Sequence, residues 1–219
     1  MRTVVFDLDG TLADTSADLL AAANACFVGL GLGELLGPGD ALTAFHGGRA
    51  MLRLGFSRMG GFGEDEVNRQ YPILLDAYAD GLDRQTRLYP GAVAAVEALR
   101  RDGFATAICT NKPEGLAVEL VRRLGVTALF DALVGADTFP VRKPDPMPYI
   151  AAVERAGGRV ARSILIGDTQ TDRDTARAAG VPVVLVTFGP EGQSITRLQP
   201  DALLDHYDDL PPLALRLIS

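Results

Sequence analysis

The fold of this chain is decided by the segment Val4-Val5-Phe6-Asp7-Leu8-Asp9-Gly10-Thr11. Its first three residues are β-branched or aromatic, which predicts a buried strand. The strand runs into two carboxylates, Asp7 and Asp9, whose i, i+2 spacing places both side chains on one side of an extended chain. Two like charges so close together repel each other, which favours a proton on one carboxylate or a cation between the two. The segment therefore predicts either an acidic turn or a functional site at the end of a strand.

The composition limits the classes of protein that the chain can belong to. Its 219 residues are enough for one sizeable core and a smaller subdomain. A formal net charge of −7 and the lack of a basic stripe argue against a nucleic-acid partner. No apolar run approaches the ~20 residues of a membrane span, and Asp7 and Asp9 interrupt the only early apolar stretch. We therefore expect no membrane contact and a cytoplasmic location.

Cysteine and histidine offer little chemistry. Cys26 and Cys109 each lie in an apolar segment without metal-ligand spacing, which indicates buried thiols and fits a reducing compartment. His46 and His206 are too few and too scattered for a histidine-based metal site. Any metal chemistry must therefore come from carboxylates.

From about residue 88 onward, apolar strands and amphipathic helices alternate. The expected strands after the first lie at 104–109, 132–134, 163–166, 183–186 and 202–204. Such alternation predicts an α/β fold with a doubly wound, mainly parallel sheet that helices cover on both faces.

Between residues 14 and 84 the alternation stops. This stretch carries only helical periodicity, with glycine-rich breaks between its helices. We therefore predict an α/β core formed by residues 1–13 and 85–219, and an inserted all-helical cap domain formed by residues 14–84. The two connections are the natural hinges.

Polar residues follow several of the predicted strands at the point where each strand ends. Asp7, Thr110, Asn111 and Asp168 follow strands directly, and Lys143 lies in a loop between a strand and a helix. The carboxyl ends of parallel strands line the ligand crevice of an open sheet. These residues are therefore expected to converge, although they are far apart in the sequence.

The converging groups suit phosphoryl transfer. Asp7 and Asp168 supply oxygen ligands for a hard cation, for which Mg²⁺ is the best match. Thr110 offers a hydroxyl donor, and Lys143 a positive charge for phosphate oxygens. A cation, a lysine and hydroxyl donors around a carboxylate are what phosphoryl transfer requires. Two carboxylates also allow one to act as nucleophile and the other as acid and base.

Each residue also has a purely structural interpretation. Thr110 can bond its own turn, and Lys143 can be a solvated loop charge. Asp168 can begin a helix cap, and Asp172 can complement a helix dipole. The combination on one sheet edge is what favours a site.

Four ordered motifs resemble those of the haloacid dehalogenase superfamily. They are Asp7-Leu8-Asp9-Gly10-Thr11-Leu12, Thr110-Asn111-Lys112-Pro113, Lys143-Pro144-Asp145-Pro146 and Gly167-Asp168-Thr169-Gln170-Thr171-Asp172. The match spans nearly the whole chain and implies a Rossmann-like core. The cap after the first motif, together with Asp14-Thr15-x-x-Asp18-Leu19 and Gln199-Pro200-Asp201, resembles the phosphoglycolate-phosphatase-like branch.

The resemblance implies a role for each catalytic residue. Asp7 would attack phosphorus and become a phosphoaspartate. Asp9 would protonate the leaving alcohol and then deprotonate the hydrolytic water. Thr110 and Lys143 would hold the phosphoryl oxygens, and Asn111 would also bind the substrate.

The resemblance also implies the magnesium ligands. They would be the side chains of Asp7 and Asp168 and the backbone carbonyl of Asp9. Asp172 would complete the acidic cluster, either as a direct ligand or through a water on the metal.

The cap departs from the pattern of the branch. Phosphoglycolate phosphatases tend to have a Gly-x-Gly element where this chain reads Phe45-His46-Gly47-Gly48-Arg49. An arginine there resembles the related β-phosphoglucomutases, whose first cap helix also carries a histidine that residues 16–24 lack. Two interpretations stay open. Arg49, with His46, grips an anionic group remote from the reacting phosphate, or Arg49 is a solvated residue at a helix start.

The favoured function is a Mg²⁺-dependent hydrolase of a small phosphorylated metabolite, with 2-phosphoglycolate or a sugar phosphate as leading candidates, acting as a monomer or homodimer. A phosphomutase is the alternative enzyme, which the missing cap histidine disfavours. A dehalogenase would not need Asp9. A phosphoacceptor signalling domain shares the acidic cluster but not an inserted helical cap.

Overall fold

A computed structural model describes residues 1–218. Contacts within the chain divide it into two compact units. The first unit combines Met1–Asp14 with the residues from Leu88 onward, and the second is Thr15–Arg87. The sequence pattern predicts these boundaries after residues 13 and 84.

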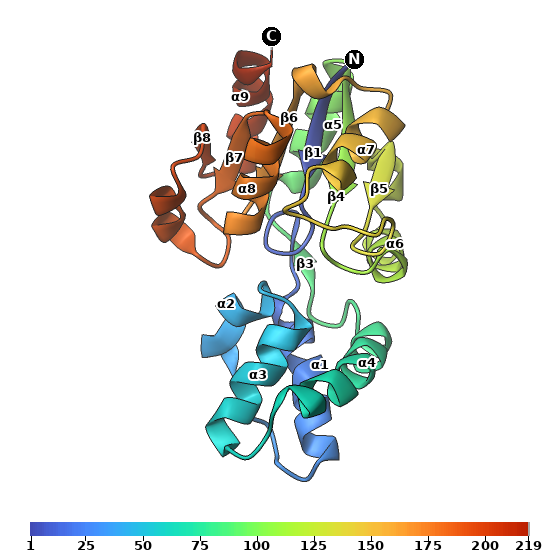
Figure 1. The fold of residues 1–219 in the computed structure, drawn as a ribbon. Helices are drawn as coiled ribbons and strands as arrows, with labels where there is room; N and C mark the ends of the chain where they lie inside the picture. Colours follow the sequence, from blue (N-terminus) through green and yellow to red (C-terminus); the bar gives the residue numbers. More distant parts are fainter. Residues whose placement is uncertain (219) are drawn as a thin grey trace. The chain divides into compact units, whose positions relative to one another are not determined.

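The first unit is built on a six-stranded sheet (Figure 1). The strands are β1 Arg2–Phe6, β4 Phe104–Cys109, β5 Ala132–Val134, β6 Ser163–Gly167, β7 Val183–Val186 and β8 Ala202–Leu204. Their order across the sheet is β5-β4-β1-β6-β7-β8, and every neighbouring pair is parallel. The chain therefore winds outward in both directions from β1, as the alternating pattern predicted.

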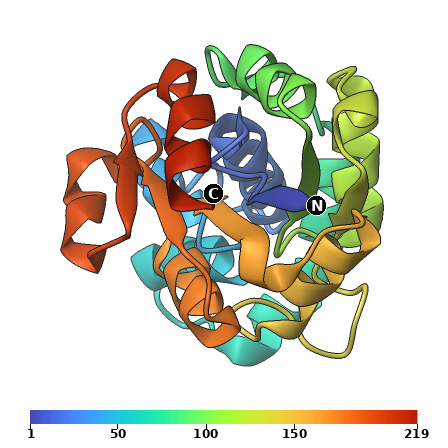
Figure 2. The ribbon, with the colours of Figure 1, turned by 90° about the horizontal axis from the view of Figure 1, so that it is seen from above.

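Helices cover both faces of this sheet, as Figure 2 shows. One face carries α5 Ala92–Arg101, α6 Glu114–Arg123 and α9 Leu210–Leu217, and the other carries α7 Met147–Arg155 and α8 Gln170–Ala179. Short 3₁₀ turns complete the connections: η2 Thr127–Leu129, η3 Val160–Arg162, η4 Gly192–Leu198 and η5 Tyr207–Asp209. The predicted doubly wound α/β fold is confirmed.

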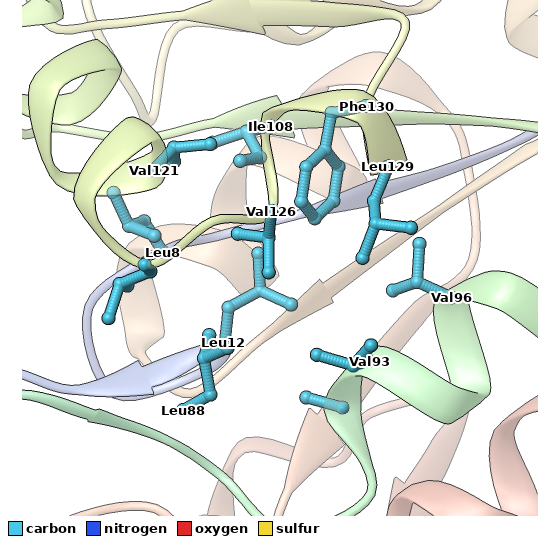
Figure 3. Close-up of a pocket in the computed structure, with 12 residues that line it drawn as sticks. Leu8, Leu12, Leu88, Val93, Val96, Ile108, Val121, Val126, Leu129 and Phe130 are labelled. Atoms are coloured by element: carbon cyan, nitrogen blue, oxygen red, sulfur yellow. The ribbon is translucent and has the colours of Figure 1, made fainter.

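The two faces of the sheet bury separate apolar clusters. Under α7 and α8, buried strand residues such as Val5 and Leu165 pack with the helix residue Tyr149. On the opposite face a small apolar pocket lies beneath α5 and α6 (Figure 3). Leu8 and Leu12 line this pocket, so the segment that carries the two acidic residues is anchored by its apolar side chains.

The second unit contains four α-helices and one 3₁₀ turn. They are α1 Ser16–Gly29, η1 Pro38–Asp40, α2 Ala41–Ala44, α3 Gly48–Met59 and α4 Glu64–Asp80. Phe27 and Phe56 meet edge to face with ring centroids 5.2 Å apart. At Gly55 a Cβ would lie 2.1 Å from the Phe27 ring, so only glycine allows α1 and α3 to pack this closely. Within residues 1–218, no helix combines the length and the apolar character that a bilayer crossing requires.

Paired backbone joins the two connecting segments. β2 Ala13–Asp14 and β3 Arg87–Leu88 form a two-stranded sheet. Beside it, the buried Asp18 carboxylate accepts hydrogen bonds from the Gln85 and Thr86 amides and from the Thr86 hydroxyl, at 2.8–3.0 Å. Thr15 is the N-cap residue of α1, and its side chain makes no capping hydrogen bond to this helix.

Candidate active site

Three buried carboxylates meet at the carboxyl ends of neighbouring strands. Asp7 follows β1, Asp168 follows β6, and Asp172 lies in the first turn of α8. Each places a carboxylate oxygen within 4.8 Å of one from the other two. Their exposed fractions are 8%, 1% and 0%. The convergence expected from the topology is therefore present in the first unit.

The backbone around Asp7 explains its fixed position. Its amide donates to the Ile166 carbonyl at 2.8 Å, which extends the β1–β6 pairing by one residue. The next residue, Leu8, lies in the apolar pocket of Figure 3. Gly10 has a φ of +83°, which L-residues rarely adopt, and turns the chain after the acidic pair.

Lys143 is the cation of this cluster. Its Nζ lies 3.1 Å from Asp7 Oδ1 and 2.6 Å from Asp172 Oδ1, and the residue is 3% exposed. The side-chain amide of Asn111 donates to the Lys143 carbonyl at 3.0 Å and so fixes the loop. Burial by itself lowers the pKa of Lys143, but the carboxylates of Asp172 and Asp7 outweigh it and raise the pKa above its usual value.

Asp172 has protein partners on both of its carboxylate oxygens. Oδ1 faces Lys143, while Oδ2 accepts from the Thr169 hydroxyl at 2.6 Å and from the Thr169 and Asp168 amides. Thr169 and Asp172 form a reciprocal capping box at the start of α8. A Cβ on Gly167 would lie 2.4 Å from the Asp172 side chain, so the strand must end on glycine here. This arrangement lets Asp172 orient both Lys143 and the turn that presents Asp168.

Two buried carboxylate oxygens of the site lack a hydrogen bond from any described residue. They are Asp7 Oδ1, which has only its ion pair with Lys143, and Asp168 Oδ2. The other Asp168 oxygen accepts from the Thr11 hydroxyl at 2.8 Å. Burial raises the pKa of Asp7 to about 6 and that of Asp168 well above its usual value. Two buried oxygens of this kind fit a hard divalent cation such as Mg²⁺.

Asp9 lies beside this cluster and has a different partner. Its two carboxylate oxygens accept from Lys112 Nζ at 2.7 and 2.9 Å. Its carboxylate is not part of the group of three, so any role as a metal ligand falls to its backbone carbonyl. Thr110 is 3% exposed, and its Oγ1 accepts the Lys112 amide at 3.1 Å.

The comparisons with known proteins agree with this geometry. A profile of haloacid dehalogenase-like hydrolases matches residues 4–186. The chain belongs to the haloacid dehalogenase-like hydrolase family. A phosphoglycolate phosphatase from Mesorhizobium japonicum is 40% identical over 98% of this chain and 96% of its own length. The corresponding enzyme of Agrobacterium fabrum is 37% identical over 98% of this chain and 93% of its own length.

A solved structure leads to the same family. The hydrolase resembles the crystal structure of a predicted phosphoglycolate phosphatase from Haemophilus somnus 129PT, with a TM-score of 0.84 and 25% identity over 97% of each chain. The predicted superfamily and the prediction of an enzyme are confirmed. The names of these relatives are those of phosphoric monoester hydrolases, the class that the sequence analysis expected.

Arg49 and His46, which the sequence motifs singled out, lie in the second unit. The Arg49 guanidinium donates to Asn68 Oδ1 at 2.5 Å and lies 4.2 Å from the centre of the Tyr71 ring. His46 follows α2, and its amide donates to the Thr43 carbonyl. The structure thus brings Asp7, Asp9, Thr110, Asn111, Lys143, Asp168 and Asp172 together in the first unit, whereas Arg49 and His46 belong to the second.

Sequence reasoning missed three residues of the hydrolase's site. Lys112 pairs with Asp9, Thr11 donates to Asp168, and the Tyr207 hydroxyl donates to the Thr11 carbonyl at 2.7 Å. Thr11 and Lys112 were both within motifs that were quoted as signatures, so their positions were visible without their roles. Tyr207 lies in no motif, and nothing in the sequence pointed to its contact.

Proposed function

We propose that this hydrolase is a Mg²⁺-dependent phosphatase that cleaves the phosphomonoester of a small metabolite through a phosphoaspartyl intermediate. The observation that supports the proposal best is the placement of Asp7. One oxygen of this buried carboxylate faces Lys143 and accepts no hydrogen bond from the described residues. A carboxylate has two oxygens, so one oxygen of Asp7 can hold Mg²⁺ while the other attacks an electrophile.

In the first step Asp7 attacks phosphorus and the ester P–O bond breaks. The leaving alkoxide takes a proton from Asp9, and an aspartyl phosphate remains on Asp7. In the second step Asp9 removes a proton from water, which attacks the aspartyl phosphate. Inorganic phosphate leaves, and Asp7 returns to its carboxylate form. Asp9 regains its proton, so the cycle balances.

The surrounding residues stabilise charge on the transferred group. Lys143 and the Thr110 hydroxyl would bind phosphoryl oxygens, with Lys143 held in place by Asp172 and by Asn111. Asp7, Asp168 and the Asp9 carbonyl would hold Mg²⁺, which when bound neutralises part of the charge on the phosphoryl oxygens.

The leading substrate is 2-phosphoglycolate. Relatives that match nearly the whole chain at 37–40% identity carry the name phosphoglycolate phosphatase. Sugar phosphates are the second class to test, because the sequence around Arg49 departs from the phosphoglycolate-phosphatase pattern and resembles that of β-phosphoglucomutases. A panel that contains 2-phosphoglycolate, several sugar phosphates and p-nitrophenyl phosphate, assayed with Mg²⁺, tests the proposal directly. If the enzyme releases phosphate from no member of the panel, the proposal is refuted.

Metal removal should stop the reaction. We expect EDTA to abolish phosphate release and Mg²⁺ to restore it, because the buried carboxylates otherwise lack a divalent counter-charge. Mg²⁺ should also raise the melting temperature of the wild-type protein through mass action, about 2.7 kcal/mol at 100 times its Kd. Asp168→Asn is the matched variant and should lose most of this thermal response. Unchanged turnover in EDTA would remove the metal from the mechanism.

Loss of Arg49 should affect substrates with a second anionic group. Arg49→Ala is expected to raise the KM for a doubly phosphorylated sugar about tenfold, and that for p-nitrophenyl phosphate much less. Arg53→Ala removes an exposed arginine from the same helix and serves as control. Equal effects of Arg49→Ala on both substrates would identify Arg49 as a surface residue that only packs on Tyr71.

A further inference from the structure

The chain contains only two lysines, and both are buried at the site. Lys112 and Lys143 are 6% and 3% exposed, whereas all 19 other basic residues are arginines. Lysine is rarely buried without a charged partner. Lys143 faces Asp7 and Asp172, on the side where the phosphoryl group would bind. Lys112 faces Asp9, and the mechanism given above assigns it no role.

The position of Lys112 is fixed by its own backbone. Its amide donates to Thr110 Oγ1 at 3.1 Å, and its carbonyl accepts the Ala136 amide at 2.9 Å. Its Nζ contacts both carboxylate oxygens of Asp9, at 2.7 and 2.9 Å. The ammonium group is therefore held next to the carboxylate that would face the leaving group.

We propose that Lys112 is a specificity-determining residue, and that it binds a carboxylate on the carbon next to the ester oxygen of the substrate. The proposal rests on the phosphatase function given above. It names the substrate class as phosphate monoesters of 2-hydroxy acids, of which 2-phosphoglycolate is the smallest.

The spacing between the ester oxygen and the carboxylate of the substrate matches the spacing between Asp9 and Lys112. Asp9 must reach the ester oxygen in order to protonate it, and Lys112 Nζ is one hydrogen bond away from Asp9. In the ester of a 2-hydroxy acid, a single carbon separates this oxygen from the carboxylate. An ammonium group has three N–H donors and acts as a compact point charge, so it can serve the substrate carboxylate and Asp9 together.

The two lysines also place positive charge on both sides of the ester bond that would be cleaved. Lys143 lies beside the nucleophile, and Lys112 lies beside the acid and base. A substrate that carries a phosphate and an adjacent carboxylate presents negative charge on both sides of its ester bond. The two buried lysines match that distribution, whereas an ester of a neutral alcohol would use only Lys143.

The test compares two esters of nearly equal size. 2-Phosphoglycolate carries the carboxylate, and 2-hydroxyethyl phosphate replaces it by a neutral hydroxymethyl group. Lys112→Met is expected to lower kcat/KM for 2-phosphoglycolate about 30-fold more than for 2-hydroxyethyl phosphate, the range of a charge-assisted hydrogen bond. Lys112→Arg should restore part of the discrimination. The phosphate monoester of 3-hydroxypropionate has one more carbon between the ester oxygen and the carboxylate. Lys112→Met should therefore lower kcat/KM less for this ester than for 2-phosphoglycolate.

Equal losses for both esters would overturn the proposal, because a lysine that only positions Asp9 acts on every substrate alike. Arg142→Met, which removes a neighbouring exposed charge, should leave the ratio unchanged. If the wild-type enzyme hydrolyses other phosphomonoesters but shows no preference between the two esters, this inference fails while the proposed function stands.

A binding measurement on the Asp7→Asn variant, which cannot form the aspartyl phosphate, tests the contact without turnover. Lysine labelled with ¹⁵N gives two side-chain signals, one for each lysine, and Lys143→Met identifies them. In the Asp7→Asn protein with Mg²⁺, 2-phosphoglycolate should shift both signals, whereas 2-hydroxyethyl phosphate should shift that of Lys143 alone. An unmoved Lys112 signal at saturation with 2-phosphoglycolate would refute the contact.

Discussion

Asp7→Asn is expected to lower kcat by at least about 10⁴-fold while the protein stays folded. The amide is nearly the same size as the carboxylate but cannot form the aspartyl phosphate, and the losses of other covalent nucleophiles are of this order. Phosphate release should be measured with 2-phosphoglycolate and with p-nitrophenyl phosphate. Asp174→Asn, at a partly exposed position of α8, is the control for the loss of a charge.

The stability of the Asp7→Asn variant should rise, although its activity falls. Burial raises the pKa of Asp7 from 3.8 to about 6, so the folded state binds this proton more tightly than the unfolded chain. Ionised Asp7 therefore costs stability above pH 6, and the cost is lost as the pH falls toward 4. Without Mg²⁺, Asp7→Asn should melt higher than wild type at pH 7, and the gap should narrow at pH 5. Full activity, or a lower melting temperature at pH 7, would contradict the assignment.

Lys143→Met is expected to be the most destabilising single substitution in the site. It leaves Asp7 and the fully buried Asp172 without their cation. Removing one partner of a buried ion pair costs about 3–5 kcal/mol, which corresponds to a fall in melting temperature of roughly 10 °C for a chain of this size. Activity should fall as well, because the phosphoryl oxygens lose their fixed positive charge.

The pH and metal dependence of this variant separate the ion pair from simple packing. The pKa of Lys143 is raised, so its charge is present throughout the neutral range. The defect in Lys143→Met should shrink as the pH falls through about 6 and Asp7 takes up a proton. Mg²⁺ should recover part of the stability, and Arg142→Met should melt like wild type. A defect that is independent of pH and metal would point to lost packing alone.

The sequence was enough to predict the part of the site that topology assembles. Asp7, Thr110 and Asp168 each follow a strand, and parallel strands end at the same edge. The place of Lys143 at the same edge of the sheet could be predicted from the strand–helix alternation, because its loop lies between a strand and a helix. The amphipathic helices were predictable for a similar reason, since their apolar spacing is a property of each segment alone.

The missed contacts depend on the position of one side chain relative to another. Lys112 and Asp9 are 103 residues apart, and only the β1–β4 pairing together with the turn at Gly10 brings their side chains together. The contact from Tyr207 to Thr11 spans 196 residues and crosses the unit from η5 to the first loop. No local pattern encodes a rotamer at either end of such a contact. The contact of Arg49 with Tyr71 could not be predicted for the same reason, because it depends on the packing of α3 against α4.

The two-residue strands β2 and β3 have a consequence for how this enzyme can diversify. They pair the ends of the inserted segment before the chain leaves the core and after it returns. The entropy of closing a loop grows only with the logarithm of its length, so a segment with fixed ends can be lengthened, shortened or replaced at little cost to the sheet. We therefore expect that residues 15–86 can be replaced by the equivalent segment of a relative, while the β2–β3 pair, both lysines and all four aspartates of the site remain.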